Sequence, residues 1–159
     1  NKGLKIFVHF RKHLIIGTAT AGYIGKIPFA PGTFGSLPGI LLFWLLAPRP
    51  LGMELLVLAA IVAAAVWVAD RAEHLMGRGD PKSVVIDEIA GMGVAFAGLP
   101  FSWPVAAAGF IVFRFFDIVK PYPIGWLEKK CSGGLGVVID DVAAGLITRV
   151  VLGIGCYLM

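Results

Sequence analysis

The sequence has little charge and little cysteine. Only 15% of its 159 residues are charged, whereas 58% are hydrophobic, a composition that excludes an intrinsically disordered chain. The two cysteines, Cys131 and Cys156, exclude the dense disulfide framework of small secreted proteins. The length accommodates one domain, residues 1–159, with no room for a second.

Several site types are also missing from the sequence. The three histidines, His9, His13 and His74, lack the spacing of a zinc site. Cys131 is not followed by arginine at the spacing of a cysteine-dependent phosphatase loop, and no secretory cleavage pattern follows the first apolar run. The net charge of +4 comes from dispersed basic residues, which argues against a nucleic-acid partner and favours an anionic membrane surface.

Long apolar runs are what the sequence does have. They predict an all-α fold, a small polytopic membrane protein with about four to five membrane-embedded helices. Several runs are short for a full span, so buried helices of a soluble bundle remain the alternative. The runs are residues 34–47, 53–69, 101–119 and 142–159, with a shorter fifth run at 89–99.

The connections between these runs predict two unlike ends. One end receives the N-terminal stretch and two predicted loops, residues 70–88 and 117–141, together with nearly every charged residue. Arg49 and Glu54 belong to the other end, and Arg149 lies within the last run, where it either reaches the interface or enters the bundle interior. The positive-inside rule makes the charged end cytoplasmic, and the sequence leaves the oligomeric state open.

Two charged or turn-forming clusters lie early in the chain. In Pro31-Gly32-Thr33-Phe34-Gly35-Ser36, Thr33 or Ser36 is expected to cap a helix whose N–H groups suit a phosphate. In Asp80-Pro81-Lys82 through Asp87-Glu88, two adjacent carboxylates open an apolar helix. Such a pair at membrane depth is costly unless it binds a cation.

Two further clusters follow. Arg114, Asp117 and Lys120 share a helix face by their spacing of three residues. Gly133, Gly134 and Gly136 precede a second carboxylate pair, Asp140-Asp141, and they suggest a loop that approaches a phosphate closely. Small residues one turn beyond each pair, Gly91 and Gly145, would let the two helices pack closely. Four carboxylates would then converge, an oxygen-rich set that selects Mg²⁺ or Mn²⁺.

Together, and in this order, the four clusters resemble the phosphatidylglycerophosphatase A family over about residues 14–148. The resemblance implies hydrolysis of phosphatidylglycerophosphate to phosphatidylglycerol and phosphate, with Mg²⁺, in the bacterial inner membrane. The expected roles divide the clusters three ways. We expect the metal ligands to be Asp87, Glu88, Asp140 and Asp141, the base to be Asp80 or Asp117, and the phosphate-binding residues to be Thr33, Ser36, Lys82, Arg114 and Lys120.

Two other functions remain open from the sequence. One is a phosphatase for another lipid phosphate, such as phosphatidic acid or a polyprenyl phosphate, which would use the same metal site. The other is a non-enzymatic ion-binding membrane subunit, which would distribute its carboxylates through the membrane depth. The gathering of acidic residues at one end disfavours this second alternative.

Overall fold

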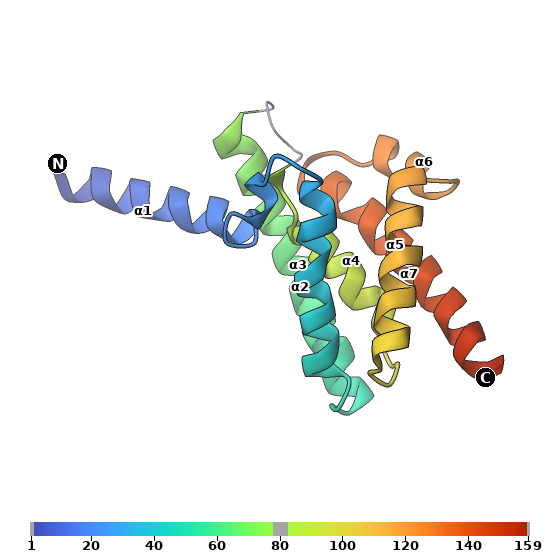
Figure 1. The fold of residues 1–159 in the computed structure, drawn as a ribbon. Helices are drawn as coiled ribbons and strands as arrows, with labels where there is room; N and C mark the ends of the chain where they lie inside the picture. Colours follow the sequence, from blue (N-terminus) through green and yellow to red (C-terminus); the bar gives the residue numbers. More distant parts are fainter. Residues whose placement is uncertain (1, 78–82, 159) are drawn as a thin grey trace.

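A computed structural model describes residues 2–77 and 83–158, and within these ranges all regular structure is helical (Figure 1). The all-α prediction is therefore confirmed. The elements are α1 (Lys2–Ala19), the 3₁₀ turn η1 (Ile24–Lys26), α2 (Pro31–Leu46), α3 (Leu51–Met76), α4 (Ile86–Phe96), α5 (Trp103–Val119), α6 (Ile124–Lys130) and α7 (Gly133–Leu158).

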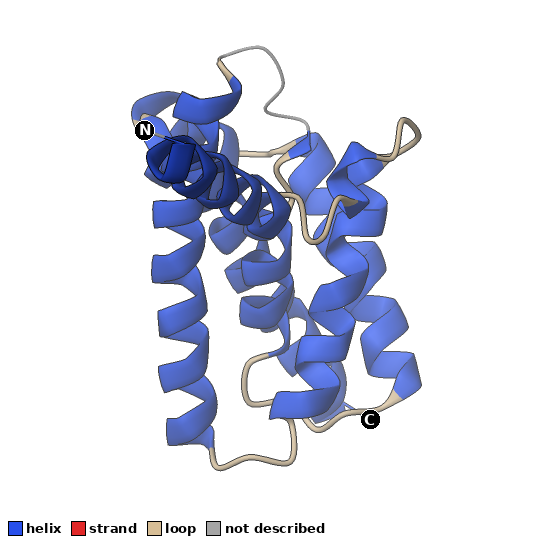
Figure 2. Ribbon diagram, turned by 90° about the vertical axis from the view of Figure 1, so that its left-hand side faces the viewer, coloured by secondary structure: helices blue, strands red, loops and turns tan. Residues whose placement is uncertain are grey.

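The helices α2, α3, α4, α5 and α7 form one bundle (Figures 1 and 2). Helices α2, α4 and α7 begin at the end where α3 and α5 finish, and α6 lies there too. We call this the polar end, because it holds the carboxylates that begin α4. The predicted division of the chain between two unlike ends thus appears in the topology.

Helix α4 is the centre of the bundle and contacts α2, α3, α5 and α7. Its Met92, Ala95 and Phe96 are almost completely buried. Phe96 stacks on Phe43 of α2 with ring centroids 4.2 Å apart. With 11 residues, α4 is only about 16 Å long at 1.5 Å per residue, so it is a core element and too short to cross a bilayer.

The outer helices carry apolar side chains that no other helix covers. Helix α3 is long and apolar enough to cross a membrane, yet only 22% of its most apolar stretch is buried within the protein. Among the described residues it is the one helix that meets both criteria, and α2 is a shorter apolar helix. The length and composition of the described helices therefore support one membrane span. They do not confirm the expected four to five membrane-embedded helices.

Two predicted loop boundaries are wrong. Residues 70–76 continue α3 instead of starting a loop, because Ala69 and Ala72 stay buried and extend its packed face. The glycine-rich stretch from Gly133 is the first turn of α7, so Asp140 and Asp141 lie two turns inside the helix. Gly134 serves close helix packing, since a Cβ there would collide with the Val66 carbonyl of α3.

The end opposite the polar end has its own buried charges. The Glu54 carboxylate accepts a hydrogen bond from the Gly98 N–H at 3.1 Å, and the Arg149 Nε donates to the Ala97 carbonyl. Both side chains therefore satisfy backbone groups just after α4 ends, where Gly98 adopts a left-handed conformation with φ of 68°. Arg149 is half-buried and turns toward the segment that follows α4.

Candidate active site

The two carboxylate pairs are brought together by the close approach of α4 and α7. A Cβ at Gly145 would collide with the Gly91 carbonyl, and a Cβ at Gly91 would press against the backbone of Asp141. The two glycines therefore allow a backbone contact that a larger residue would prevent. Asp87, in the first turn of α4, consequently lies near both residues of the second pair. After burial and Glu88, the charge of Asp140 helps to raise the pKa of Asp87, and the charge of Asp87 helps to raise the pKa of Asp141.

A group of three carboxylates fits a divalent cation. One oxygen each from Asp117, Asp140 and Asp141 lies within 4.8 Å of the other two. Asp140 and Asp141 are buried, and each has one Oδ1 atom without a hydrogen-bond partner in the described part of the chain. Buried carboxylate oxygens without partners are costly, and hard oxygen donors of this kind suit Mg²⁺ or Mn²⁺.

Burial makes the ionised form of these acids unfavourable. Burial first, and then the charges of Asp87 and Asp117, raise the pKa of Asp141 well above its usual range. Burial and the neighbouring Glu88 do the same to the pKa of Asp87. Burial also raises the pKa of Asp140, although its hydrogen bond and charge interaction with Lys120 oppose the shift. A bound cation would offset this repulsion, so the electrostatics agree with the geometry.

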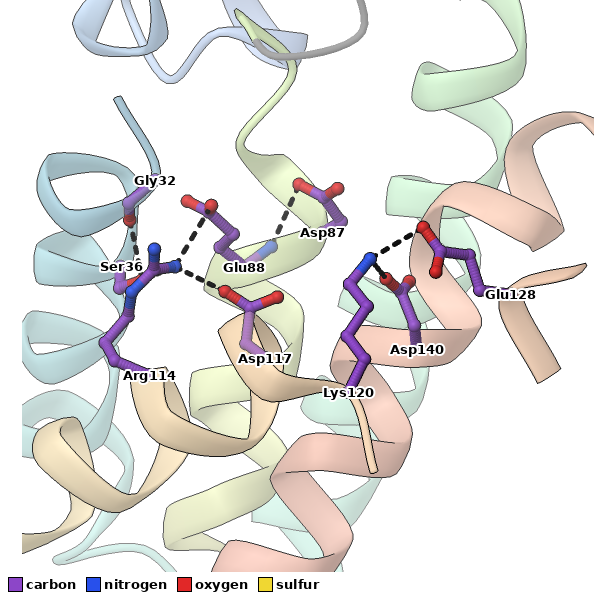
Figure 3. Close-up of polar contacts among 9 residues, drawn as sticks. All are labelled: Gly32, Ser36, Asp87, Glu88, Arg114, Asp117, Lys120, Glu128 and Asp140. Atoms are coloured by element: carbon purple, nitrogen blue, oxygen red, sulfur yellow. Dashed lines mark hydrogen bonds and ion pairs between the residues drawn. The ribbon is translucent and has the colours of Figure 1, made fainter. Parts of the chain in front are cut away.

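Arg114 connects three helices next to the carboxylates (Figure 3). Its Nη1 atom donates to Asp117 Oδ2 at 2.6 Å, to Glu88 Oε1 at 3.3 Å and to Ser36 Oγ at 3.4 Å. Gly32 allows this approach, because a Cβ there would collide with the Glu88 carboxylate. The Arg114 Nε and Glu88 Oε2 atoms are buried without a partner among the described residues.

The Glu88 carboxyl is balanced between two opposing effects. Burial raises its pKa, and the Arg114 guanidinium lowers it, so that the pKa of Glu88 rises from 4.5 to about 7. Glu88 is therefore close to half-protonated at neutral pH. Of the four expected metal ligands, Glu88 is paired with Arg114 and Asp140 is paired with Lys120.

Lys120 is held between two carboxylates (Figure 3). Its Nζ atom lies 2.6 Å from Asp140 Oδ2 and 2.7 Å from Glu128 Oε1. Burial lowers the pKa of Lys120, but the hydrogen bonds to the two carboxylates outweigh it and leave the pKa raised. Lys120 thus stays charged beside the acidic group. Glu128 of α6 was not expected from the sequence, where it lies in an ordinary run of polar residues.

A cavity of about 650 Å³ opens beside this group. It is lined by Asp87 and Glu73 on one side, by Lys120, Glu128 and Asp140 on another, and by residues 131–133 and 136–137 of the turn before α7 and its first helical turns. Asp140 of the acidic group and Lys120 therefore face an opening of the protein surface, as residues of an active site do.

The remaining expected residues are Thr33 and Ser36 of α2, together with Asp80 and Lys82. Ser36 is buried, and its hydroxyl donates to the Gly32 carbonyl at 2.8 Å. Thr33 lies in the first turn of α2, whose cap residue is Ala30, with no side-chain cap. The expected capping role is therefore wrong, because Pro31 starts the helix before either hydroxyl. Asp80 and Lys82 lie outside the described residues.

Comparison with known proteins identifies the relatives of this chain. The chain is 37% identical over 129 residues to phosphatidylglycerophosphatase A of Escherichia coli (strain K12), covering 80% of this chain and 75% of the relative. It is 37% identical over 131 residues to the protein of the same name from Haemophilus influenzae, covering 80% of each. A Bacteroides thetaiotaomicron protein, named as a candidate phosphatidylinositol-3-phosphatase, is 37% identical over 153 residues, covering 89% of this chain and 91% of the relative.

No solved structure shows a significant match. The sequence model of one family, described as phosphatidylglycerophosphatase A, matches residues 17–155. This match takes in α2 to α6 and nearly all of α7, and with them every described residue of the candidate site. The chain belongs to the phosphatidylglycerophosphatase A family.

Proposed function

We propose that the protein hydrolyses phosphatidylglycerophosphate to phosphatidylglycerol and inorganic phosphate. The observation that carries this proposal is the group of Asp117 and the buried Asp140 and Asp141, with two cationic side chains beside it, in a chain of this family. Phosphate esters are anionic, so their hydrolysis calls for positive charge around the phosphoryl oxygens. Arg114 and Lys120 supply part of that charge from the protein itself.

Asp117, Asp140 and Asp141 would hold Mg²⁺, or Mn²⁺ in its place, with Asp87 beside them. When bound, such a cation neutralises phosphate charge and makes a water molecule more acidic. Glu88, also expected as a ligand, instead accepts from Arg114 at 3.3 Å, so we assign it the role of orienting that arginine. Asp117 is better placed as a ligand than as a base, which leaves Asp80 as the proposed base.

Arg114 would bind the substrate phosphate through the side of its guanidinium that the carboxylates leave free. Its Nη1 atom is already used by Asp117, Glu88 and Ser36, whereas the buried Nε atom has no partner among the described residues. Lys120 would hold a second phosphoryl oxygen from the cavity wall. Thr33, Ser36 and Lys82 remain proposed contacts of the phosphate from the start of α2 and the segment before α4.

We place the polar end at the cytoplasmic surface of the bacterial inner membrane. Large apolar side chains project outward from α2, α3, α5 and α7, among them Leu41, Leu56, Ile111 and Val150. Such a surface is unfavourable in water and suits lipid. With α4 as a short inner helix, these helices make up the four to five membrane-embedded segments, and the acyl chains of the substrate remain in the bilayer.

A second substrate class is favoured by one specific observation. The Bacteroides thetaiotaomicron relative, named for an inositol lipid phosphate, matches more of this chain than the two relatives named for phosphatidylglycerophosphate. Both compounds are lipid phosphate monoesters, so the same acidic group and cations could act on either. The enzyme would then distinguish the two substrates by which lipid headgroup fits the cavity.

Phosphate release from defined lipids tests the proposal. The purified chain is assayed in micelles containing phosphatidylglycerophosphate, phosphatidylinositol 3-phosphate, phosphatidic acid or a polyprenyl phosphate, each with Mg²⁺ or with EDTA. We expect EDTA-sensitive release that is fastest from phosphatidylglycerophosphate. Faster release from another lipid would replace the proposed substrate, and no release from any lipid by folded protein would favour an ion-binding subunit.

Matched variants connect the activity to the site. Asp140→Asn and Asp141→Asn should each lose at least about 100-fold in phosphate release, since each removes a proposed ligand charge. Asp70→Asn is the control: Asp70 accepts from the Gly134 N–H at 3.4 Å, and an asparagine oxygen can accept the same bond. Near-normal turnover by Asp141→Asn would contradict the proposed ligand set.

A further inference from the structure

Helix α1 leaves the bundle at the polar end and runs sideways, away from the other helices (Figure 1). Viewed from that side, it points toward the reader across the top of the bundle (Figure 2). Only its last turns are anchored, through Ile15 and Ala19, which are buried against α3. The family match begins at residue 17, so most of α1 lies outside the matched region and has no part in the site described above.

The free part of α1 carries one apolar stripe. Ile6, Phe7, Phe10 and Leu14 are 70%, 64%, 61% and 54% exposed, and their spacing of three or four residues places them on one face of the helix. Two exposed phenylalanines on one helix are unfavourable in water. No other described helix covers this stripe, and the polar residues His9, Arg11 and His13 lie between its members along the chain.

Basic residues flank this stripe on α1. The first 19 residues contain four lysines or arginines and no aspartate or glutamate. Lys12 is exposed and lies about 160° around the helix from Phe10, at 100° per residue. Apolar side chains on one face and basic side chains around them are typical of helices that lie in the interface of an anionic membrane.

We propose that α1 lies in the interfacial plane of an anionic membrane leaflet, with Ile6, Phe7, Phe10 and Leu14 toward the acyl chains. This inference rests on the proposed function in one respect, the placement of the polar end at a membrane surface. A bundle that crosses the bilayer would hold its sideways helix parallel to that surface. The stripe would then anchor the polar end at the depth of the lipid headgroups.

The positive charge of α1 favours anionic lipid over a second copy of the helix as the group that covers the stripe. A second copy of α1 would bring four more basic residues against the first, which is unfavourable. Anionic headgroups are complementary to these basic residues and attract them to the membrane surface. A protein partner or a second copy would shield the stripe from every solvent probe, whereas lipid shields it only from polar ones.

Spin-label accessibility in nanodiscs separates these cases. A nitroxide is attached to the 159-residue chain at Phe10→Cys, or at Lys12→Cys as the matched control, in a Cys131→Ser, Cys156→Ser background. Both positions are exposed, so neither label disturbs packing. Collisions with oxygen, which enters lipid, and with a water-soluble nickel chelate are measured in nanodiscs of phosphatidylcholine with and without phosphatidylserine. Phosphate release is measured on the unlabelled wild-type chain in the same nanodiscs, because Cys131 lines the cavity of the candidate site.

We expect the oxygen-to-nickel accessibility ratio at position 10 to exceed that at position 12 several-fold, and to rise when phosphatidylserine is included. Equal ratios at the two positions would overturn the inference, and so would protection of position 10 from both probes, which indicates a protein contact. Equal ratios with normal phosphate release would leave the proposed function standing. A higher ratio at position 10 than at position 12, without phosphate release from any lipid, would support the placement of α1 and contradict the proposed function.

Discussion

The ionisation of Glu88 should cost the metal-free protein stability as the pH rises. The pKa of Glu88 is raised from 4.5 to about 7, because burial, together with the charges of Asp117 and Asp140, outweighs the lowering effect of Arg114. Because the folded state binds this proton more tightly than the unfolded state, the contribution is fully present below pH 4.5. It is then lost as the pH rises through 7. At about 1.4 kcal/mol per pH unit, the loss approaches roughly 3 kcal/mol above pH 8.

The variant Glu88→Gln isolates this effect, since glutamine resembles the protonated acid and does not titrate. The free energy of unfolding is measured in detergent with EDTA between pH 5 and 8.5, for wild type and for the variant. We expect similar values at pH 5 and a variant that is more stable by about 2–3 kcal/mol at pH 8.5. Arg49→Gln, at an exposed residue of the opposite end, should keep the wild-type pH dependence. Equal pH slopes for wild type and Glu88→Gln would refute the reasoning.

Three further predictions address the rest of the site. Mg²⁺ should raise the melting temperature of wild type but not of Asp141→Asn, and more at pH 8 than at pH 6, because the cation competes with protons; an equal shift in the variant would place the cation elsewhere. Gly145→Ala should destabilise the protein by about 1–3 kcal/mol in chemical unfolding, because its Cβ meets the Gly91 carbonyl; a neutral effect would contradict the close contact. Lys120→Ala should lower phosphate release more than Lys120→Arg, which keeps a charge near Asp140; equal rates would argue against a role for that charge.

Local features of the site could be predicted from the sequence. Asp87 and Glu88 occupy the first turn of α4, as their position before an apolar run suggests. The pairing of Arg114 with Asp117 follows from their spacing of three residues on one helix. The contact between Gly91 and Gly145 was also predictable, because two small residues at matching positions allow close packing. Each of these inferences needs only the period of a helix.

Features that depend on tertiary packing could not be predicted. The bond from Arg114 to Glu88 joins residues 26 positions apart, and Glu128 reaches Lys120 only because α6 turns back toward α7. The glycines from Gly133 were interpreted as a loop, since glycine is common in loops. In the structure these glycines begin α7, where Gly134 packs against α3. The sequence around Gly133 gives no indication that α3 is the neighbouring helix.

The unequal lengths of the helices explain why a charged site forms inside so apolar a chain. Helix α3 has 26 residues and α4 has 11, and α3 continues past the start of α4 at the polar end (Figure 1). The carboxylates that begin α4 are therefore recessed among longer helices, where burial raises their pKa values. A recess just inside the end of a membrane-embedded bundle lies near the depth of lipid headgroups. The short helix α4 thus creates both the need for a cation and the position from which a lipid phosphate can be reached.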